Sequence, residues 1–150
     1  MFGVWLGVDV GTVRVGVARC DPHGMLATPL TTLNRDEKGN SDIAALVDLV
    51  AEHEAVGVVI GLPRTLAGAE GTSAQMARGY ADLVAVAIRP LPVELSDERL
   101  STTSAQRKLI QAGRNTRKSR AVIDQAAAVV ILQHWLDSAS TRERLSERPN

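Results

Sequence analysis

The sequence predicts an α/β fold: a mixed sheet of three antiparallel and two parallel strands, flanked by helices, in the order βββαβαβαα. Two observations lead to this prediction. Near the N-terminus, apolar and polar or small residues alternate, as they do in strands with one packed face. Farther along, short β-branched apolar runs alternate with segments of helical periodicity, which is typical of βαβ units. The length of 150 residues suits one domain with one core.

The first two strands are expected to form a hairpin over residues 3–20, with Gly11 and Thr12 at the turn. Valines alternate with small or polar residues on both sides of that turn. A third strand is expected over residues 25–33, because residues 21–24 are strong turn formers. These strands form the antiparallel meander of the predicted sheet.

Helices and strands alternate in the remaining chain. Ser41 is the expected N-cap of a first helix. The later expected segments are a strand over 55–62, a helix over 72–88, a strand over 93–95, a helix from Ser101 or Thr102 to 111, a basic loop over 114–120 and a helix over 119–138. We therefore expect one domain at residues 1–138, followed by a polar tail at residues 139–150.

Composition argues against several classes of protein. Apolar residues make up 45% and charged residues 23% of the chain, as in ordinary soluble globular proteins. Cys20 is the only cysteine, so we expect neither an internal disulfide nor a zinc site built from cysteines. A single cysteine also suits a reducing compartment. The chain has no apolar run of 18 residues and no basic signal-peptide start. We expect a cytoplasmic protein without a membrane partner.

Positive charge is concentrated in one segment although the formal net charge is zero. Residues 99–123 hold seven cations and no acid, which leaves ten cations and 17 acids elsewhere. The seven are Arg99, Arg107, Lys108, Arg114, Arg117, Lys118 and Arg120. Such asymmetry favours a polyanion-binding region in an otherwise acidic protein. The alternative is a solvated basic loop.

Three sets of carboxylates are candidates for chemistry. Asp9 shares one face of the first strand with glycines, where there is room beside it for a ligand. Asp97 and Glu98 directly follow the strand at 93–95, and either could serve. Asp124 lies on a largely apolar face of the last helix. The structural alternatives are backbone hydrogen bonds for Asp9, a helix-dipole role for the acidic pair, and an ion pair with Arg120 for Asp124.

Carboxylates from a first strand, a strand end and a late helix repel one another unless a cation lies between them. Carboxylate oxygens are hard donors, and Mg²⁺ and Mn²⁺ are the cations that such donors bind in proteins. Two such ions can activate water and stabilise the leaving oxygen in phosphodiester hydrolysis. His23, His53 and His134 lack metal-ligand spacing, and we assign them no catalytic role.

Four ordered motifs carry a resemblance to a known family. They are LGVDVGTVRVGVA at residues 6–18, VVIGLP at 58–63, DERLST at 97–102 and IDQAAA at 123–128. Over residues 3–137 the chain resembles the bacterial YqgF (RuvX) family. The resemblance implies a ribonuclease H-like nuclease fold and one of two substrates. One is a Holliday junction in branched DNA, and the other is the 5′ end of pre-16S ribosomal RNA.

The resemblance also implies roles for particular residues. Asp9, Glu98 and Asp124 match the family's acidic positions, and Arg14 matches its strand-two arginine. Arg117, Lys118 and Arg120 stand where the family has a basic turn, here interrupted by Ser119, and Ser101 replaces a usual threonine.

Nucleic-acid binding is expected to rest on phosphate contacts. The candidates are Arg14, Arg99, Arg107, Arg114, Arg117, Lys118 and Arg120, because arginine and lysine add affinity without reading sequence. Aromatic residues are only 3% of the chain, which favours recognition of shape over base stacking. The sequence leaves precursor rRNA and branched DNA open. It leaves monomer and homodimer open too, since only symmetric cutting of a junction requires two active sites.

Two other classes were weighed. An actin-like kinase or ATPase is disfavoured because the chain has neither a second DxG phosphate loop nor a Walker lysine. A non-catalytic nucleic-acid-binding module is the other alternative, since fold alone does not fix function. The presence of all three acids favours catalysis.

Overall fold

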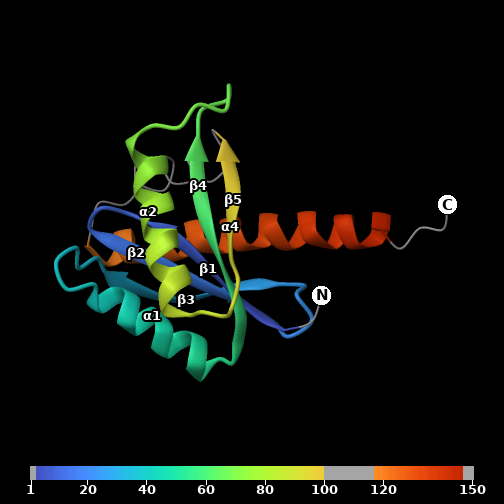
Figure 1. Ribbon diagram of the computed structural model, residues 1–150, viewed down its shortest axis with the longest axis horizontal. Coiled ribbons are helices and arrows are strands. Elements are labelled where there is room, and N and C mark those ends of the chain that lie inside the picture. The colour runs from blue at the N-terminus through green and yellow to red at the C-terminus, as the bar shows by residue number, and fades with distance from the viewer. Residues whose placement is uncertain (1–2, 100–116, 147–150) are drawn as a thin grey trace.

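The computed structural model describes residues 3–99 and 117–146 of the chain (Figure 1). The described strands form one mixed sheet in the order β3-β2-β1-β4-β5. They are β1 (Val4–Val10), β2 (Arg14–Cys20), β3 (Ala27–Asn34), β4 (Ala55–Arg64) and β5 (Val93–Arg99). β1, β2 and β3 pair antiparallel, whereas β4 pairs parallel with both β1 and β5. This arrangement confirms the predicted α/β fold.

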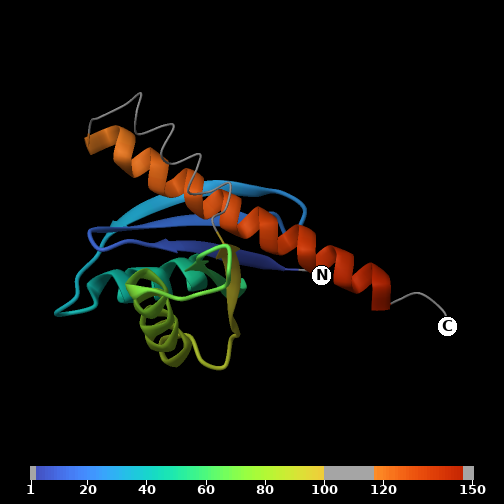
Figure 2. The same ribbon diagram turned by 90° about the horizontal axis from the view of Figure 1, so that it is seen from above.

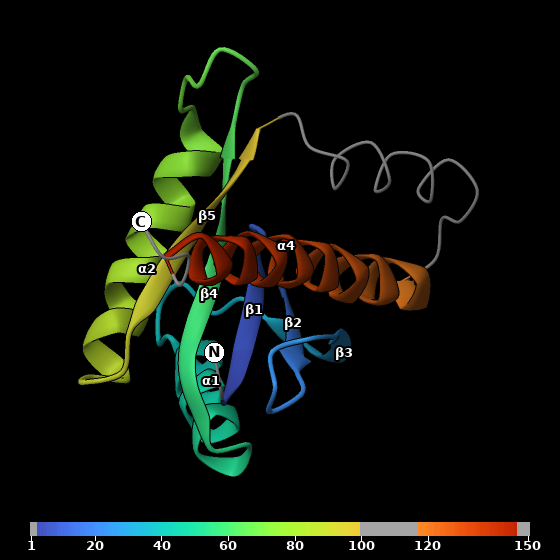
Figure 3. The same ribbon diagram turned by 90° about the vertical axis from the view of Figure 1, so that its right-hand side faces the viewer.

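Helices cover both faces of the sheet, as the view from above shows (Figure 2). They are α1 (Ser41–Glu52), α2 (Thr72–Ala87) and α4 (Arg117–Ser146). α1 and α2 lie on one face, and α4 crosses the strands on the other (Figure 3). The expected helix from 101 or 102 to 111 lies outside the described residues. None of the helices in the described ranges is long and apolar enough to cross a membrane.

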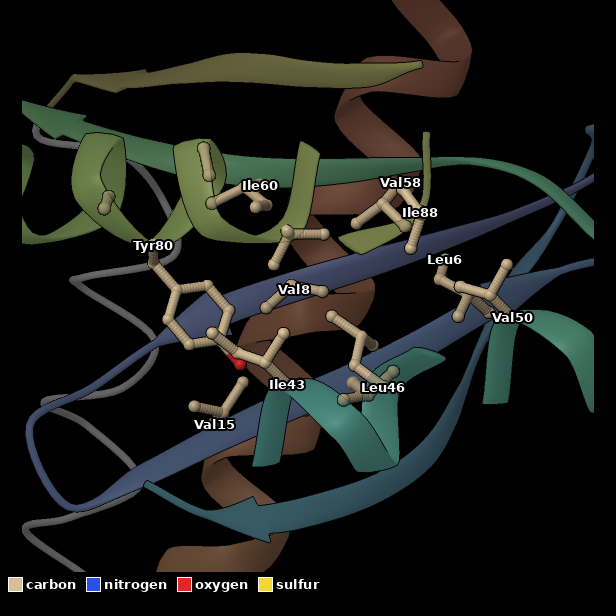
Figure 4. Close-up of a cluster of buried hydrophobic side chains, with 14 of the residues drawn as sticks. Leu6, Val8, Val15, Ile43, Leu46, Val50, Val58, Ile60, Tyr80 and Ile88 are labelled. Carbon is tan, nitrogen blue, oxygen red and sulfur yellow. The ribbon is translucent and has the colours of Figure 1, made fainter. Parts of the chain in front are cut away.

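The alternation of side chains in the strands divides the core into two layers. The larger layer lies between the sheet and α1 and α2 (Figure 4). Its labelled members are Leu6, Val8, Val15, Ile43, Leu46, Val50, Val58, Ile60, Tyr80 and Ile88. The second layer lies under α4 and includes Trp5, Val59, Ile131, Leu132 and Trp135. The two faces of β1 therefore pack against different helices.

Glycines on the α4 face of the sheet let the helix approach closely. A Cβ added to Gly7 of β1 would lie 2.5 Å from Cβ of Leu132 and 3.0 Å from the carbonyl oxygen of Ala128. A Cβ on Gly16 of β2 would collide with the backbone carbonyl of Asp124. This close packing brings the N-terminal half of α4 against β1 and β2.

Two expectations about helix ends were wrong. Ser41 is not the N-cap of α1: Asn40 holds that position in the left-handed region, and the Ser41 hydroxyl donates to Asp36 instead. The last helix was expected over 119–138, but α4 extends from Arg117 to Ser146. Its extra C-terminal residues include arginine, glutamate and leucine, all good helix formers. The division into a domain at 1–138 and a tail at 139–150 stays a prediction.

The acidic segment after the predicted strand at 93–95 also differs from expectation. β5 continues through Asp97 and Glu98 to Arg99. Acidic residues are disfavoured in strands, but here the longer β4 supplies a parallel partner as far as Arg64, opposite Arg99. Tertiary pairing therefore overrides local preference, and the acids lie within the sheet.

Candidate active site

Asp9 lies at the next-to-last position of β1, on the face that α4 covers. Gly7, two residues earlier, shares this face and touches α4, so alternation places Asp9 there as well. The side chain is half-buried, and its partner across the antiparallel ladder is Gly16 of β2. The predicted location of Asp9 on the glycine-lined face is thereby confirmed.

Asp124 is brought to Asp9 by the passage of α4 over Gly16. The carbonyl of Asp124 occupies the space where a Gly16 side chain would stand. Directly opposed residues of an antiparallel pair have their Cβ positions about 5 Å apart. The segment of α4 that carries Asp124 therefore lies beside Asp9. This approach requires a strand residue without a side chain at position 16.

Arg14 forms an ion pair with Asp124. Its Nε lies 3.0 Å from Oδ2 of Asp124, and the two side chains are 23% and 18% exposed. Arg14 begins β2 two residues before Gly16, so the two share the α4 face. The ion pair with Arg120 that the sequence offered as an alternative stays a prediction, because the side chain of Arg120 lies outside the described residues. The guanidinium offsets carboxylate charge at this point of the surface.

Glu98 points to the same face of the sheet from β5. It pairs in register with Pro63, and Gly61 on the same side of β4 meets Ile131 of α4. Its carboxylate accepts from the Ser96 hydroxyl at 3.0 Å, and Oε1 lies 3.2 Å from Nδ1 of His134. Glu98 is 8% exposed. Burial raises the pKa of Glu98, although the contacts with His134 and Ser96 oppose the shift.

Asp97 lies on the opposite face, because neighbouring strand residues alternate. Its Oδ2 lies 3.3 Å from Nη1 of Arg64. Of the two acids that the sequence left open, only Glu98 shares a face with Asp9 and the helix carrying Asp124. The extension of β5 makes this distinction, since residues in a loop would not have to alternate.

Ser96 and His134 were missed at the sequence level. Ser96 lies two residues before Glu98 in β5, a spacing that would have placed it beside Glu98 had the strand been assigned its full length. His134 was given no catalytic role, yet its ring contacts the carboxylate of Glu98. No local pattern reveals that contact, because it depends on how α4 crosses β5.

The three predicted acids meet α4 at different points along its axis. Asp9 and the Asp124 segment are neighbours, whereas Glu98 contacts α4 at His134, ten residues after Asp124. At 1.5 Å per helical residue, that separation is about 15 Å along the axis. Among the residues that the structure describes, no three histidine, cysteine or acidic side chains are grouped to hold a metal ion. The acids thus lie on one face of the sheet, with the Asp124 segment of α4 over Gly16 and Glu98 beside His134 farther along the helix.

A pair of carboxylates is still a suitable donor set for Mg²⁺. This ion usually takes one or two protein carboxylates and completes its shell with water and substrate phosphate. Asp9 and Asp124 offer hard oxygen donors, and the ion pair with Arg14 shows that Asp124 accepts a cationic partner at this position. By the chemistry of their oxygen donors, Asp9 and Asp124 suit a divalent cation.

The structure describes only part of the predicted basic region. Arg107 and Arg114 lie outside the described residues. Arg99 ends β5, and Arg117, Lys118 and Arg120 lie at the start of α4, but the described part does not include their side chains. The expected loop over 114–120 is wrong for residues 117 and 118, which are helical, as are 119 and 120 where the predicted helix began. Their contacts with phosphate stay a prediction.

Comparisons with known proteins agree with this architecture. A family model described as "RuvX: Holliday junction resolvase" matches residues 3–138. A protein of Mycobacterium ulcerans (strain Agy99) is 57% identical over 136 residues, which cover 91% of this chain and 79% of that protein. A protein of Frankia casuarinae is 54% identical over 135 residues, covering 90% and 67% respectively. Both relatives carry the name "Putative pre-16S rRNA nuclease".

Solved structures resemble the chain in fold. A T. thermophilus RuvC in complex with a Holliday junction substrate aligns with a TM-score of 0.52 and 13% identity, covering 91% of this chain and 94% of that one. The fowlpox virus Holliday junction resolvase aligns with a TM-score of 0.51 and 12% identity, covering 90% and 99%. At these identities the likeness concerns the fold alone, and it agrees with the expected α/β fold.

Proposed function

The chain belongs to the RuvX family of Holliday junction resolvases and is a nuclease, and from this premise we propose that it processes the 5′ end of pre-16S ribosomal RNA. The relatives that share more than half of its residues are named for that substrate. The observation that carries the catalytic assignment is the approach of Asp124 to Asp9 across Gly16. Glu98 on the same face completes the proposed set of catalytic residues.

The carboxylates of Asp9, Glu98 and Asp124 would hold Mg²⁺ or Mn²⁺. When bound, such an ion supplies Lewis acidity at the scissile phosphate and lowers the pKa of water. Glu98, buried on the same face of the sheet, would be the third acid of the site. Ser96 and His134 both contact Oε1 of Glu98 and orient its carboxylate.

Arg14 has a second role in this proposal. It neutralises Asp124 in the structure and lies within the same group of charges as the proposed cation site. A guanidinium in this place can bind a phosphate oxygen of the substrate and hold the scissile bond against the carboxylates. Arg99, Arg107, Arg114, Arg117, Lys118 and Arg120 would extend phosphate binding beyond the site. We also place the protein in the cytoplasm, which agrees with its free, buried Cys20.

The test is a cleavage assay with a pre-16S rRNA fragment and a four-way DNA junction, each with Mg²⁺ or Mn²⁺. The wild type should cut the rRNA fragment, and Asp9→Asn should lower the rate by more than about 100-fold, as expected when a metal-binding group is lost. Asp48→Asn is a matched control, because Asp48 is exposed on α1, on the other side of the sheet. Equal cleavage by wild type and Asp9→Asn would show the catalytic assignment to be wrong.

Resolution of branched DNA is the second candidate, favoured by the family description and the RuvC-like fold. Symmetric resolution of a junction needs two active sites, so this activity would require a homodimer, whereas rRNA processing is compatible with a monomer. Cutting of the junction in preference to the rRNA, by a protein whose mass in light scattering is that of a dimer, would establish this candidate instead.

A metal-binding measurement separates a nuclease from a non-catalytic module. Mn²⁺ should raise the melting temperature of the wild type, because a ligand that binds only the folded state stabilises it. Asp9→Asn should lose this effect, and Asp48→Asn should keep it. A melting curve unaffected by metal, together with no cleavage of either substrate, would identify the chain as a nucleic-acid-binding module without catalysis.

A further inference from the structure

A second group of charges lies at the C-terminal ends of β4 and β5. Arg64 is the last residue of β4 and directly follows Pro63, the register partner of Glu98. Strand alternation directs Arg64 to the face opposite Glu98, toward α2. The loop at residues 65–71 joins β4 to α2 at this edge. The charged group is therefore adjacent to Glu98 at the ends of these strands, but it lies on the opposite face of the sheet.

Two arginines converge on one carboxylate here. Arg64 donates from Nε and Nη2 to Oε2 of Glu70, at 3.2 Å and 2.9 Å. Arg78 of α2 donates from Nε to Oε1 at 2.6 Å and from Nη2 to Oε2 at 2.7 Å. The side chains of Arg64, Glu70 and Arg78 are 23%, 27% and 44% exposed. One anionic group thus accepts four hydrogen bonds where solvent can reach it.

We propose that Arg64 and Arg78 bind a backbone phosphate of the nucleic-acid substrate, and that Glu70 occupies their binding site when no substrate is present. Guanidinium groups bind carboxylate and phosphate oxygens with the same two-pronged geometry. A phosphodiester carries one negative charge, as the Glu70 carboxylate does. It can replace that carboxylate without changing the charge of the group.

The loop can release Glu70 without losing its own shape. The backbone nitrogen of Thr65 donates to the carbonyl of Ala69, that of Gly68 donates to the carbonyl of Thr65, and that of Ala69 donates to the Thr65 hydroxyl. None of these hydrogen bonds involves Glu70. Because exposed ion pairs contribute little to stability, moving the Glu70 side chain into water costs the fold little.

Arg64 would stay oriented after that release. Its Nη1 lies 3.3 Å from Oδ2 of Asp97 in β5, an interaction that does not include Glu70. The guanidinium would therefore continue to face the edge of the sheet. Hydrogen bonds from Arg78 and, to a smaller extent, from Arg64 lower the pKa of Glu70 to about 2. The competing carboxylate is therefore charged at any physiological pH. Competition between Glu70 and phosphate should accordingly depend on salt and not on neutral pH.

This inference rests on the proposed function, because it assumes a nucleic-acid substrate at this edge. The test measures binding of a fluorescein-labelled RNA stem-loop by fluorescence anisotropy in EDTA, over a range of salt concentrations, so that cleavage does not contribute. The variants are Glu70→Gln, Arg64→Gln and Arg78→Gln. The matched control is Glu52→Gln, which removes one exposed negative charge from the C-terminal end of α1, before β4 begins.

Glu70→Gln should bind the RNA about three- to tenfold more tightly than Glu52→Gln, the range expected from releasing two exposed ion pairs. Each arginine variant should bind more weakly, and its slope of log affinity against log salt should be smaller by about one. If the group has only a structural role, Glu70→Gln should bind the RNA no more tightly than Glu52→Gln, because a loosened loop would weaken binding or leave it unchanged.

The outcomes separate this inference from the proposed function. If the wild type binds the RNA but Glu70→Gln binds no more tightly than Glu52→Gln, the phosphate site is refuted and the nuclease proposal stands. If the wild type does not bind the RNA, both fail. Should Arg64→Gln misfold in circular dichroism, Glu70→Gln and Arg78→Gln still decide the result.

Discussion

Replacing Gly16 with alanine tests the contact that brings Asp124 to Asp9. Gly16 lies opposite Asp9 in β2, and the backbone of α4 passes directly over it. A Cβ there would lie closer than 3.0 Å to the carbonyl group of Asp124 and 3.1 Å from the backbone nitrogen of Gln125. The obstacle is helix backbone, which cannot rotate aside as a flexible side chain can. Strand and helix must therefore separate.

The size of the effect follows from this obstruction. Adding a methyl group to a well-packed contact costs about 1–3 kcal/mol, and we expect the upper end because backbone must move. Separation would also loosen Ile131 and Leu132, which are buried under the same helix. For a domain of this length, each kcal/mol lowers the melting temperature by about 2–4 °C. Gly16→Ala should therefore lower it by about 6–12 °C.

Thermal unfolding followed by circular dichroism measures this change. Gly79→Ala is the matched control: it lies within α2, and no atom lies within 4 Å of its added Cβ. Alanine there should stabilise the protein by about 0.5–1 kcal/mol, since it favours the helix more than glycine does. Cleavage by Gly16→Ala should fall even well below its melting temperature, because Asp124 moves. A melting temperature at or above that of the wild type would refute the described packing of α4 on β2.

Three further predictions concern other buried groups. Glu98→Gln should gain stability relative to wild type in urea unfolding as the pH rises above the usual glutamate pKa of 4.5. Burial raises the pKa of Glu98 above its usual 4.5, so the folded wild type is favoured when Glu98 is protonated. This stabilisation is fully present below pH 4.5 and is lost as the pH rises through the raised pKa. A stability difference between the two proteins that does not depend on pH would contradict this. Tyr80→Phe should destabilise the protein by about 1.5–3 kcal/mol, because the Tyr80 hydroxyl donates at 2.9 Å to the fully buried carboxylate of Asp42, and an unchanged melting temperature would count against it. Cys20 is 2% exposed and burial raises its pKa, so Ellman's reagent should label it only at the rate of unfolding, and rapid labelling of native protein would be inconsistent with this layer of the core.

Much of the fold was predictable from local patterns. Alternation in β1 correctly placed Asp9 on the face with Gly7 and its even-numbered neighbours in the other core layer. The apolar face of the last helix was predicted correctly too, with Ile131 and Trp135 buried. These predictions succeed because side-chain direction within a strand or helix follows directly from its period.

Predictions failed where a partner element changed the local outcome. The strand at 93–95 extends to Arg99 because β4 provides a ladder partner along its whole length. That extension separates Asp97 from Glu98 onto opposite faces, a choice the sequence left open. His134 reached Glu98 through a crossing of helix and strand that no short segment encodes.

The sequence by itself determined which elements form, which residues share a face within each element, and which acids are available for chemistry. Only the tertiary structure decided the pairing of Arg14 with Asp124 across 110 positions and the contact of Glu98 with His134, ten residues after Asp124 in α4. The physical reason is that periodicity acts over a few neighbouring residues. The position of α4 over the sheet is set instead by glycines and apolar side chains that meet only when distant segments pack.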